Sequence, residues 1–253
     1  MNLLIATMVL STVVAIRSTW SPCGWSMLST LTPLSERSRG KGYFGIVSWY
    51  ILGAGLGGAL LGLVMAAVGS FVALFDPSNT VQLTIGFLAC LICIISDSPS
   101  IGLTLPKHTR QVNEDWIDLY RRWISASGFG LQIGFGFATY ITTSGVYLFA
   151  LLTILLARPF DAFFIGTGFG FVRGISILFG VGIDTPKSLA GFHKKFDHLG
   201  ELAQRLTLVT MVFVAIWLIG NLWWPLSILV GIPMLIITTF NELGLRSHNE
   251  SIA

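Results

Sequence analysis

Residues 17–28 read Arg-Ser-Thr-Trp-Ser-Pro-Cys-Gly-Trp-Ser-Met-Leu and interrupt an otherwise apolar run from Asn2 to Leu34. Pro22 has no amide hydrogen and clashes with the carbonyl four residues before it, so we expect the helix to kink or unwind just before Cys23. Freed backbone groups are costly in hydrocarbon unless protein or a watery cavity shelters them. We therefore predict a broken membrane span, which places a thiol, several hydroxyls and the Arg17 guanidinium at mid-membrane depth.

The composition is that of a membrane protein. Hydrophobic residues make up 53% of the chain and charged residues only 11%, which excludes an ordinary soluble domain. A hydrocarbon core of about 30 Å requires roughly 20 apolar residues per helix, so the chain has room for about six or seven crossings. We predict a single all-α domain over residues 1–253 whose main partner is the lipid bilayer. The net charge of +3 comes from loops without a basic, aromatic-rich patch, so nucleic-acid binding is not expected.

Apolar runs and turn residues divide the chain. The expected spans are 2–34, 43–72, 81–96, 128–157, 160–183 and 206–240, and the last divides at residues 221–225 into two short spans. Two amphipathic stretches, residues 107–127 and 187–205, carry apolar side chains at helical spacing between charged ones. The first of these is typical of a helix lying in the membrane interface.

Basic residues predict the orientation. They gather in the first, third and fifth loops, whereas the intervening turns hold only Arg158. The loop residues are Arg37, Arg39, Lys41, Lys107, Arg110, Arg121, Arg122, Lys187, Lys194, Lys195 and Arg205. By the positive-inside rule these loops are cytoplasmic, and the N-terminus of this multi-pass protein of the cell membrane lies outside.

An internal repeat is also indicated. When the chain is aligned with itself so that Gly24 matches Gly145, the two overlong spans coincide. This alignment predicts an inverted repeat of three plus three helices, in which each repeat begins with a broken helix. Repeat 1 covers about residues 2–98, repeat 2 about residues 128–223, and an extra span about residues 225–240. The second break, at Thr142, Thr143 and Ser144, has no proline, so we expect its distortion to be the milder one.

Glycines at every fourth position indicate close helix packing. Gly53 and Gly57, Gly58 and Gly62, and the series from Gly166 to Gly174 have the small-xxx-small spacing of membrane helix interfaces. The letters around Gly53 also match a dinucleotide fingerprint, but that motif requires a preceding strand.

The three cysteines differ in their setting. Cys23 follows a proline at the start of a half-helix, where unpaired amides and the helix dipole favour a thiolate, so a redox role and an inert role both stay open. Cys90 and Cys93, in the middle of the third span, are either packing residues or redox partners of Cys23. The histidines form no metal-ligand spacing, and we expect no metal and no cofactor.

Two arginines lie well inside predicted spans. Arg17 either faces the protein interior or extends along its stem toward the membrane surface, and Arg173 should face the interior. Together with Thr142, Thr143 and Ser144, these arginines would suit the pathway of a small solute or ion.

Residues 21–28, with Pro22 and Cys23, resemble the first span of the cytochrome c biogenesis and thiol:disulfide interchange transmembrane family, the CcdA/DsbD type. The resemblance implies an inverted-repeat carrier of reducing equivalents that exchanges electrons with thioredoxin-like proteins through one cysteine in each repeat. The second repeat here carries Thr142-Thr143-Ser144 where that family has proline and cysteine.

Three hypotheses follow from the sequence. The first is a membrane protein of thiol redox chemistry or cytochrome c maturation, with Cys23 as the reactive thiol. The alternatives are a small-solute or ion transporter on the same scaffold and a non-catalytic membrane partner of another complex. Whether the protein is an enzyme stays open at this point.

Overall fold

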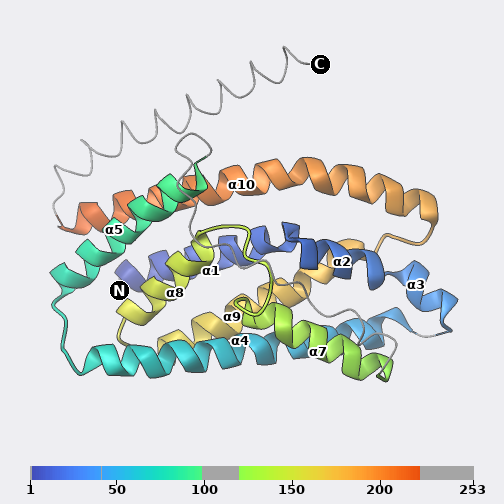
Figure 1. The fold of residues 1–253 in the computed structure, drawn as a ribbon, viewed down its shortest axis with the longest axis horizontal. Helices are drawn as coiled ribbons and strands as arrows, with labels where there is room; N and C mark the ends of the chain where they lie inside the picture. The colour runs from blue at the N-terminus through green and yellow to red at the C-terminus, as the bar shows by residue number, and fades with distance from the viewer. Residues whose placement is uncertain (1, 41, 99–119, 223–253) are drawn as a thin grey trace, which may run out of the picture.

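The computed structural model describes residues 2–40, 42–98 and 120–222. Every regular element in these ranges is a helix (Figure 1). Within them, five helical segments are long and apolar enough to cross a membrane: Leu3–Trp20, Tyr43–Ala73, Asn79–Asp97, Pro159–Gly180 and Pro186–Leu222. The predicted class, an all-α integral membrane protein, is confirmed.

The first span is broken where the sequence predicts. Helix α1 (Asn2–Arg17) runs into a 3-10 turn, η1 (Ser18–Trp20), and α2 (Pro22–Thr30) begins after the extended residue Ser21. The Ser21 side chain accepts a hydrogen bond from the Gly24 amide and so caps α2, while Pro22 occupies the first turn, where its missing amide hydrogen costs nothing. Cys23 therefore lies in the first turn of a half-helix, as predicted.

Glycine faces hold the next helices together. Helix α4 (Tyr43–Ala73) packs along both α7 (Arg122–Phe135) and α9 (Pro159–Ile175). A Cβ on Gly57 would lie 2.1 Å from the Leu131 carbonyl oxygen of α7, and one on Gly58 would lie 2.5 Å from the Gly166 carbonyl oxygen of α9. The predicted small-residue faces are thus confirmed as sites of backbone-to-backbone packing.

The second break is wider than the first, so the prediction of a milder distortion is wrong. Helix α7 ends at Phe135, α8 (Gly145–Leu155) begins ten positions later, and residues 136–144 between them form no regular helix. Gly136 has φ +76°, a left-handed conformation that ends α7, and the Thr139 hydroxyl donates to the Gly136 carbonyl. The predicted boundary at residue 128 is also wrong, because α7 already begins at Arg122. Residues 107–119 of the predicted interface helix lie outside the described residues.

The last described element is one helix instead of two segments. Helix α10 (Pro186–Leu222) follows a second 3-10 turn, η2 (Ser176–Gly180), and continues through the predicted boundary at residue 206. No proline interrupts residues 187–222, and the amphipathic half is held by Phe196, which is buried against Trp20. Leu199, three residues after Phe196 in the amphipathic stretch, is exposed. The additional span at about residues 225–240 lies outside the described residues.

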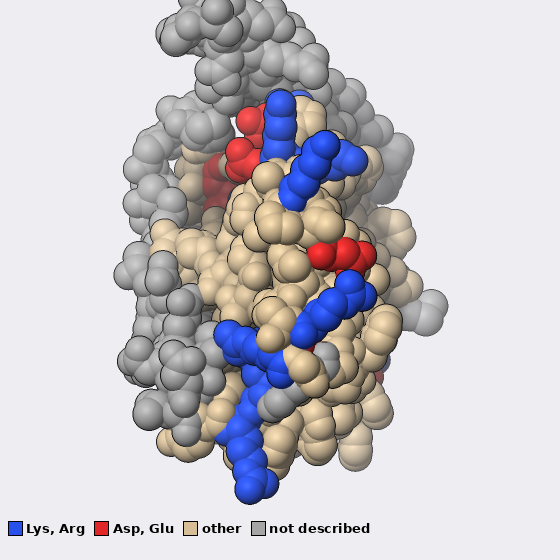
Figure 2. All heavy atoms as spheres, turned by 90° about the vertical axis from the view of Figure 1, so that its right-hand side faces the viewer, with Lys and Arg blue, Asp and Glu red and all other residues tan. Residues whose placement is uncertain are grey.

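The described loops in which basic residues gather lie at one end of the bundle, whereas Arg158 lies at the other. Figure 1 shows α3 (Pro33–Ser38), the start of α7 and the start of α10 at that end, and the N-terminus and the α4–α5 and α8–α9 connections at the other. Figure 2 looks onto the first end, where lysines and arginines gather. Its exposed basic residues include Arg37, Arg39, Arg121, Lys187, Lys194 and Lys195. The cytoplasmic location of this end and the two-fold relation between the halves stay predictions.

Candidate functional site

Buried apolar side chains form two clusters. The large cluster joins α1, α4, α5 (Asn79–Asp97), α8, α9 and α10, and includes Leu10, Cys90, Cys93, Phe149 and Met211. The small cluster, nearer the basic end, joins α2, α4, α7, η2 and α10, and includes Cys23, Met27, Phe129 and Phe196. All three cysteines are free and buried, so the structure places Cys23 in one cluster and the other two cysteines in the other.

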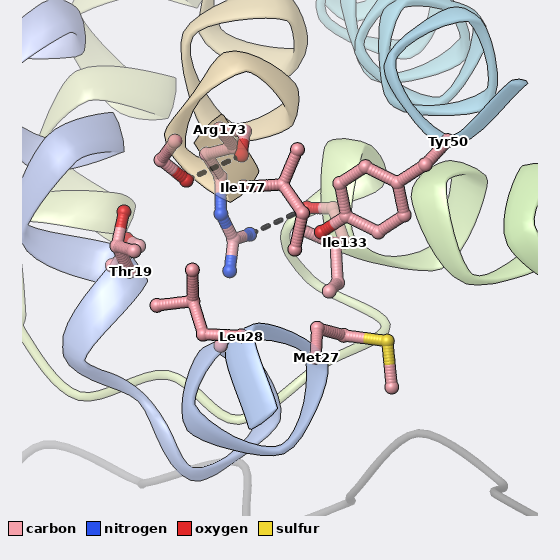
Figure 3. Close-up of a pocket in the computed structure, with 10 residues that line it drawn as sticks. Thr19, Met27, Leu28, Tyr50, Ile133, Arg173 and Ile177 are labelled. Carbon is pink, nitrogen blue, oxygen red and sulfur yellow. Dashed lines mark hydrogen bonds between the residues drawn. The ribbon is translucent and has the colours of Figure 1, made fainter. Parts of the chain in front are cut away.

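The first break borders a small polar cavity of about 10 Å³, roughly the space of one water molecule (Figure 3). Its wall combines the 3-10 turn and the start of α2 with side chains from α4, α7 and α9. Ser18, Thr19, Gly24, Tyr50, Arg173 and Ser176 supply its polar and backbone groups. The Thr19 hydroxyl is buried and has no hydrogen-bond partner among the described residues.

Arg173 is the cation of this cavity. It is only 4% exposed, and its Nη1 donates to the Ile133 carbonyl oxygen at 2.6 Å, near the end of α7 (Figure 3). Its guanidinium also lies 5.6 Å from the centre of the Phe169 ring. The sequence prediction that Arg173 faces the interior is confirmed.

Cys23 lies within the electrostatic range of Arg173. The thiol interacts with this guanidinium and with the phenol of Tyr50, and the side chain is 2% exposed. Its neighbour Gly24 lines the cavity, and a Cβ there would lie 2.1 Å from the Thr19 carbonyl oxygen. The first break thus places a buried guanidinium at a small cavity, and a buried thiol on the adjoining turn lies within electrostatic range of that guanidinium.

The second break is anchored by Asp97, a residue that the sequence analysis missed. Asp97 ends α5, and its carboxylate accepts hydrogen bonds from the Thr143 hydroxyl and, at 2.9 Å, from the Ser144 amide. The Ser144 hydroxyl in turn donates to the Cys93 carbonyl oxygen at 2.9 Å. A carboxylate at a helix N-terminus is favoured by the free amides and the dipole there. An acidic residue directly after the predicted span 81–96 is the signal in the sequence that points to Asp97.

Arg17 connects the two breaks. It is the last residue of α1 and interacts electrostatically with Asp97. Val14, one turn earlier, lies against α8, since a Cβ on Gly145 would be 2.7 Å from its Cγ2. Thr142 has a buried hydroxyl that no described group pairs with. Of the predicted pathway residues, Thr143 and Ser144 bind Asp97 and Arg17 lies within its electrostatic range, whereas Arg173 lines the cavity at the first break.

A buried ion pair stabilises the basic end. The Arg122 guanidinium binds the Glu36 carboxylate, with Nε to Oε1 at 3.0 Å, and ties α3 to the start of α7. Arg122 is 6% exposed and Glu36 is fully buried. The prediction that Arg122 is an ordinary charged residue of an exposed loop is therefore wrong, because its side chain is buried and paired with Glu36. Among the described residues, no three His, Cys, Asp or Glu side chains are placed to hold a metal ion.

Sequence comparisons relate the chain to proteins named methylamine utilization protein MauF. It is 28% identical to that of Paracoccus versutus over 57% of this chain and 53% of the relative. It is 27% identical to that of Paracoccus denitrificans over 54% and 50%, and 29% identical to that of Methylorubrum extorquens over 58% and 52%. The chain thus spans about half the length of these relatives. None of the three is named as a transporter.

No protein-family model matches the chain, and no solved structure matches it.

Proposed function

We propose that this multi-pass membrane protein carries out thiol–disulfide exchange in a protein-maturation pathway, with Cys23 as its reactive thiol. The observation that carries the proposal is the position of Cys23 in the first turn of a half-helix, within electrostatic range of the buried guanidinium of Arg173. Reactive cysteines are characteristically found at helix N-termini or next to arginine and lysine, and Cys23 has both features. The MauF relatives suggest methylamine utilization as the setting.

Cys90 and Cys93 have a different environment. Both lie on α5 within the large apolar cluster, with Leu10 and Phe149, and among the described residues no guanidinium acts on either thiol. Buried thiols in apolar surroundings are typically inert. We therefore assign them to packing and propose that Cys23 acts through a mixed disulfide with another protein.

The exchange balances with a thioredoxin-like dithiol as reductant. The Cys23 thiolate attacks one sulfur of a substrate disulfide, so that a Cys23–substrate disulfide forms and one substrate thiolate leaves. A thiolate of the dithiol then attacks the Cys23 sulfur, so that the second substrate thiolate leaves and a disulfide forms between Cys23 and the dithiol protein. The other thiol of the dithiol protein attacks this mixed disulfide, which closes a disulfide within the dithiol protein and frees Cys23. Two electrons pass from the dithiol to the substrate, and its two protons neutralise the departing thiolates.

Access to Cys23 requires α2 to separate from α10. In the structure the Trp20 ring stacks on Phe196 with ring centres 4.7 Å apart, and Trp20 Nε1 donates to the Phe196 carbonyl at 2.7 Å. Both contacts lie beside α2, and Phe196 belongs to the same buried cluster as Cys23. Exchange with a protein partner therefore takes place in a conformation in which this contact is open.

Single-cysteine variants test the assignment. Each variant keeps one of Cys23, Cys90 and Cys93 with the other two changed to alanine, and its rate of modification by a small thiol reagent is measured in detergent. If solvent exposure alone set the rate of modification, Cys93, which is 5% exposed, would react faster than Cys23, which is 2% exposed. We expect Cys23 to react at least about tenfold faster than either, and Arg173→Gln to remove this advantage while Arg173→Lys retains part of it. Equal rates for Cys23 with and without Arg173 would contradict the proposal.

A further inference from the structure

A groove of about 400 Å³ lies between the first break and α10, separate from the small cavity that Arg173 lines. Arg17, Trp20 and Trp25 form one wall, and side chains of α10 form the other. Its volume lies in the range of small-molecule sites, and its lining is mainly polar. The groove is therefore large enough for a small organic ligand.

Arg17 lines this groove and carries a guanidinium that is only partly paired. Its Nε and Nη1 are buried and have no partner among the described residues. Asp97 acts on Arg17 electrostatically, but its carboxylate already accepts from Thr143 and Ser144. Buried donors of a cation are costly to leave unpaired, and more so at membrane depth. A guanidinium with free donors is well suited to a phosphate or carboxylate group.

The opposite wall carries charges of both signs. Asp197 and Glu201 lie one turn apart on α10, and both are exposed side chains that line the groove. Lys194 and His198 also border it. The two carboxylates offer acceptors for an ammonium group, and the faces of Trp20 and Trp25 favour a cation nearby.

We propose that this groove binds a small zwitterion, with its anionic group on Arg17 and its ammonium group on Asp197 and Glu201. The same chemistry occurs in soluble molecules, such as phosphoethanolamine, and in the head group of phosphatidylethanolamine. The site is independent of thiol chemistry, because Cys23 does not line the groove.

Calorimetric titration of the full chain tests whether the groove binds a soluble zwitterion. The chain is kept in maltoside micelles, which carry neither phosphate nor amine. The probes are phosphoethanolamine, inorganic phosphate and ethanolamine. We expect phosphoethanolamine to bind at least tenfold more tightly than the other two, and Arg17→Gln to weaken it at least tenfold. The double variant D197N/E201Q changes only exposed side chains, so it should fold, and it should reduce phosphoethanolamine binding to the level of phosphate. Arg158→Gln, at the opposite end, and Cys23→Ser should both bind as the unmodified chain does.

Native mass spectrometry tests the lipid source. The chain is released from nanodiscs that contain equal amounts of phosphatidylethanolamine and phosphatidylglycerol. If the head group is the ligand, phosphatidylethanolamine is retained preferentially, and both D197N/E201Q and Arg17→Gln lose this preference. The proposal is overturned if phosphoethanolamine binds no more tightly than phosphate or ethanolamine and phosphatidylethanolamine is not retained over phosphatidylglycerol. It is also overturned if either preference survives in D197N/E201Q. Either result would leave the reactivity of Cys23 untouched, so failure of this site and failure of the thiol proposal can be told apart.

Discussion

Replacement of Gly166 by alanine should weaken the packing of α4 against α9. A Cβ at residue 166 would lie 2.5 Å from both the Cα and the nitrogen of Gly62 and 2.9 Å from the Gly58 carbonyl oxygen. Carbon atoms pack best at about 3.5 Å, so the two helices would have to separate by roughly 1 Å. All three neighbours are backbone atoms and cannot rotate away.

The size of the effect follows from two opposing terms. Overpacking of this kind costs typically about 1–3 kcal/mol, and backbone neighbours favour the upper end of that range. Alanine gains up to about 1 kcal/mol over glycine in helix propensity, so we expect a net loss of about 2 kcal/mol in the free energy of unfolding.

Gly168 provides a matched control on the same helix, because a Cβ there meets no atom within 4 Å. Unfolding of both variants by SDS in mixed micelles, followed by circular dichroism, measures the difference. Gly168→Ala should be neutral or stabilising. A Gly166→Ala variant as stable as Gly168→Ala would refute the inference that backbone contact at this face holds α4 to α9.

Three further outcomes are expected. Arg122→Gln should destabilise the protein by about 3–5 kcal/mol in the same unfolding assay, because it leaves the Glu36 carboxylate buried without its cation, and R122M/E36L should recover much of that loss. Asp97→Ala should lower the free energy of unfolding by about 1–3 kcal/mol and should increase hydrogen exchange at the Ser144 amide, which loses its acceptor. Unchanged exchange at this amide would contradict the capping role of Asp97. Trp20→Ala should raise the rate of Cys23 modification in the variant that keeps only that cysteine, whereas an unchanged rate would mean that the α10 contact does not limit access.

Features with a local cause were predictable from the sequence. The break before Pro22 follows from the missing amide hydrogen of one residue, and the helix faces at Gly58 and Gly166 follow from spacing alone. The interior position of Arg173 follows from the cost of placing a charge in lipid. Each of these inferences needed only a few neighbouring residues and the properties of the bilayer.

Features that depend on distant partners were not predictable in the same way. Asp97 acts on Ser144, which is 47 residues away, and Glu36 binds Arg122 across 86 residues. The second break is wider than Thr142–Ser144 predict, because Gly136 already ends α7 with a positive φ. Helix α10 continues past residue 206, where the amphipathic pattern changes, because no proline interrupts residues 187–222.

Trapping of a mixed disulfide tests the role of Cys23 most directly. The full chain with Cys90 and Cys93 changed to alanine is incubated in native membranes with a thioredoxin-like protein that lacks its resolving cysteine. A disulfide-linked complex should form through Cys23, dissociate on reduction, and be absent when Cys23 is also changed to serine. Absence of any complex in the variant that retains Cys23, or an equal amount of complex after Cys23→Ser, would contradict the assignment of Cys23 as the reactive thiol.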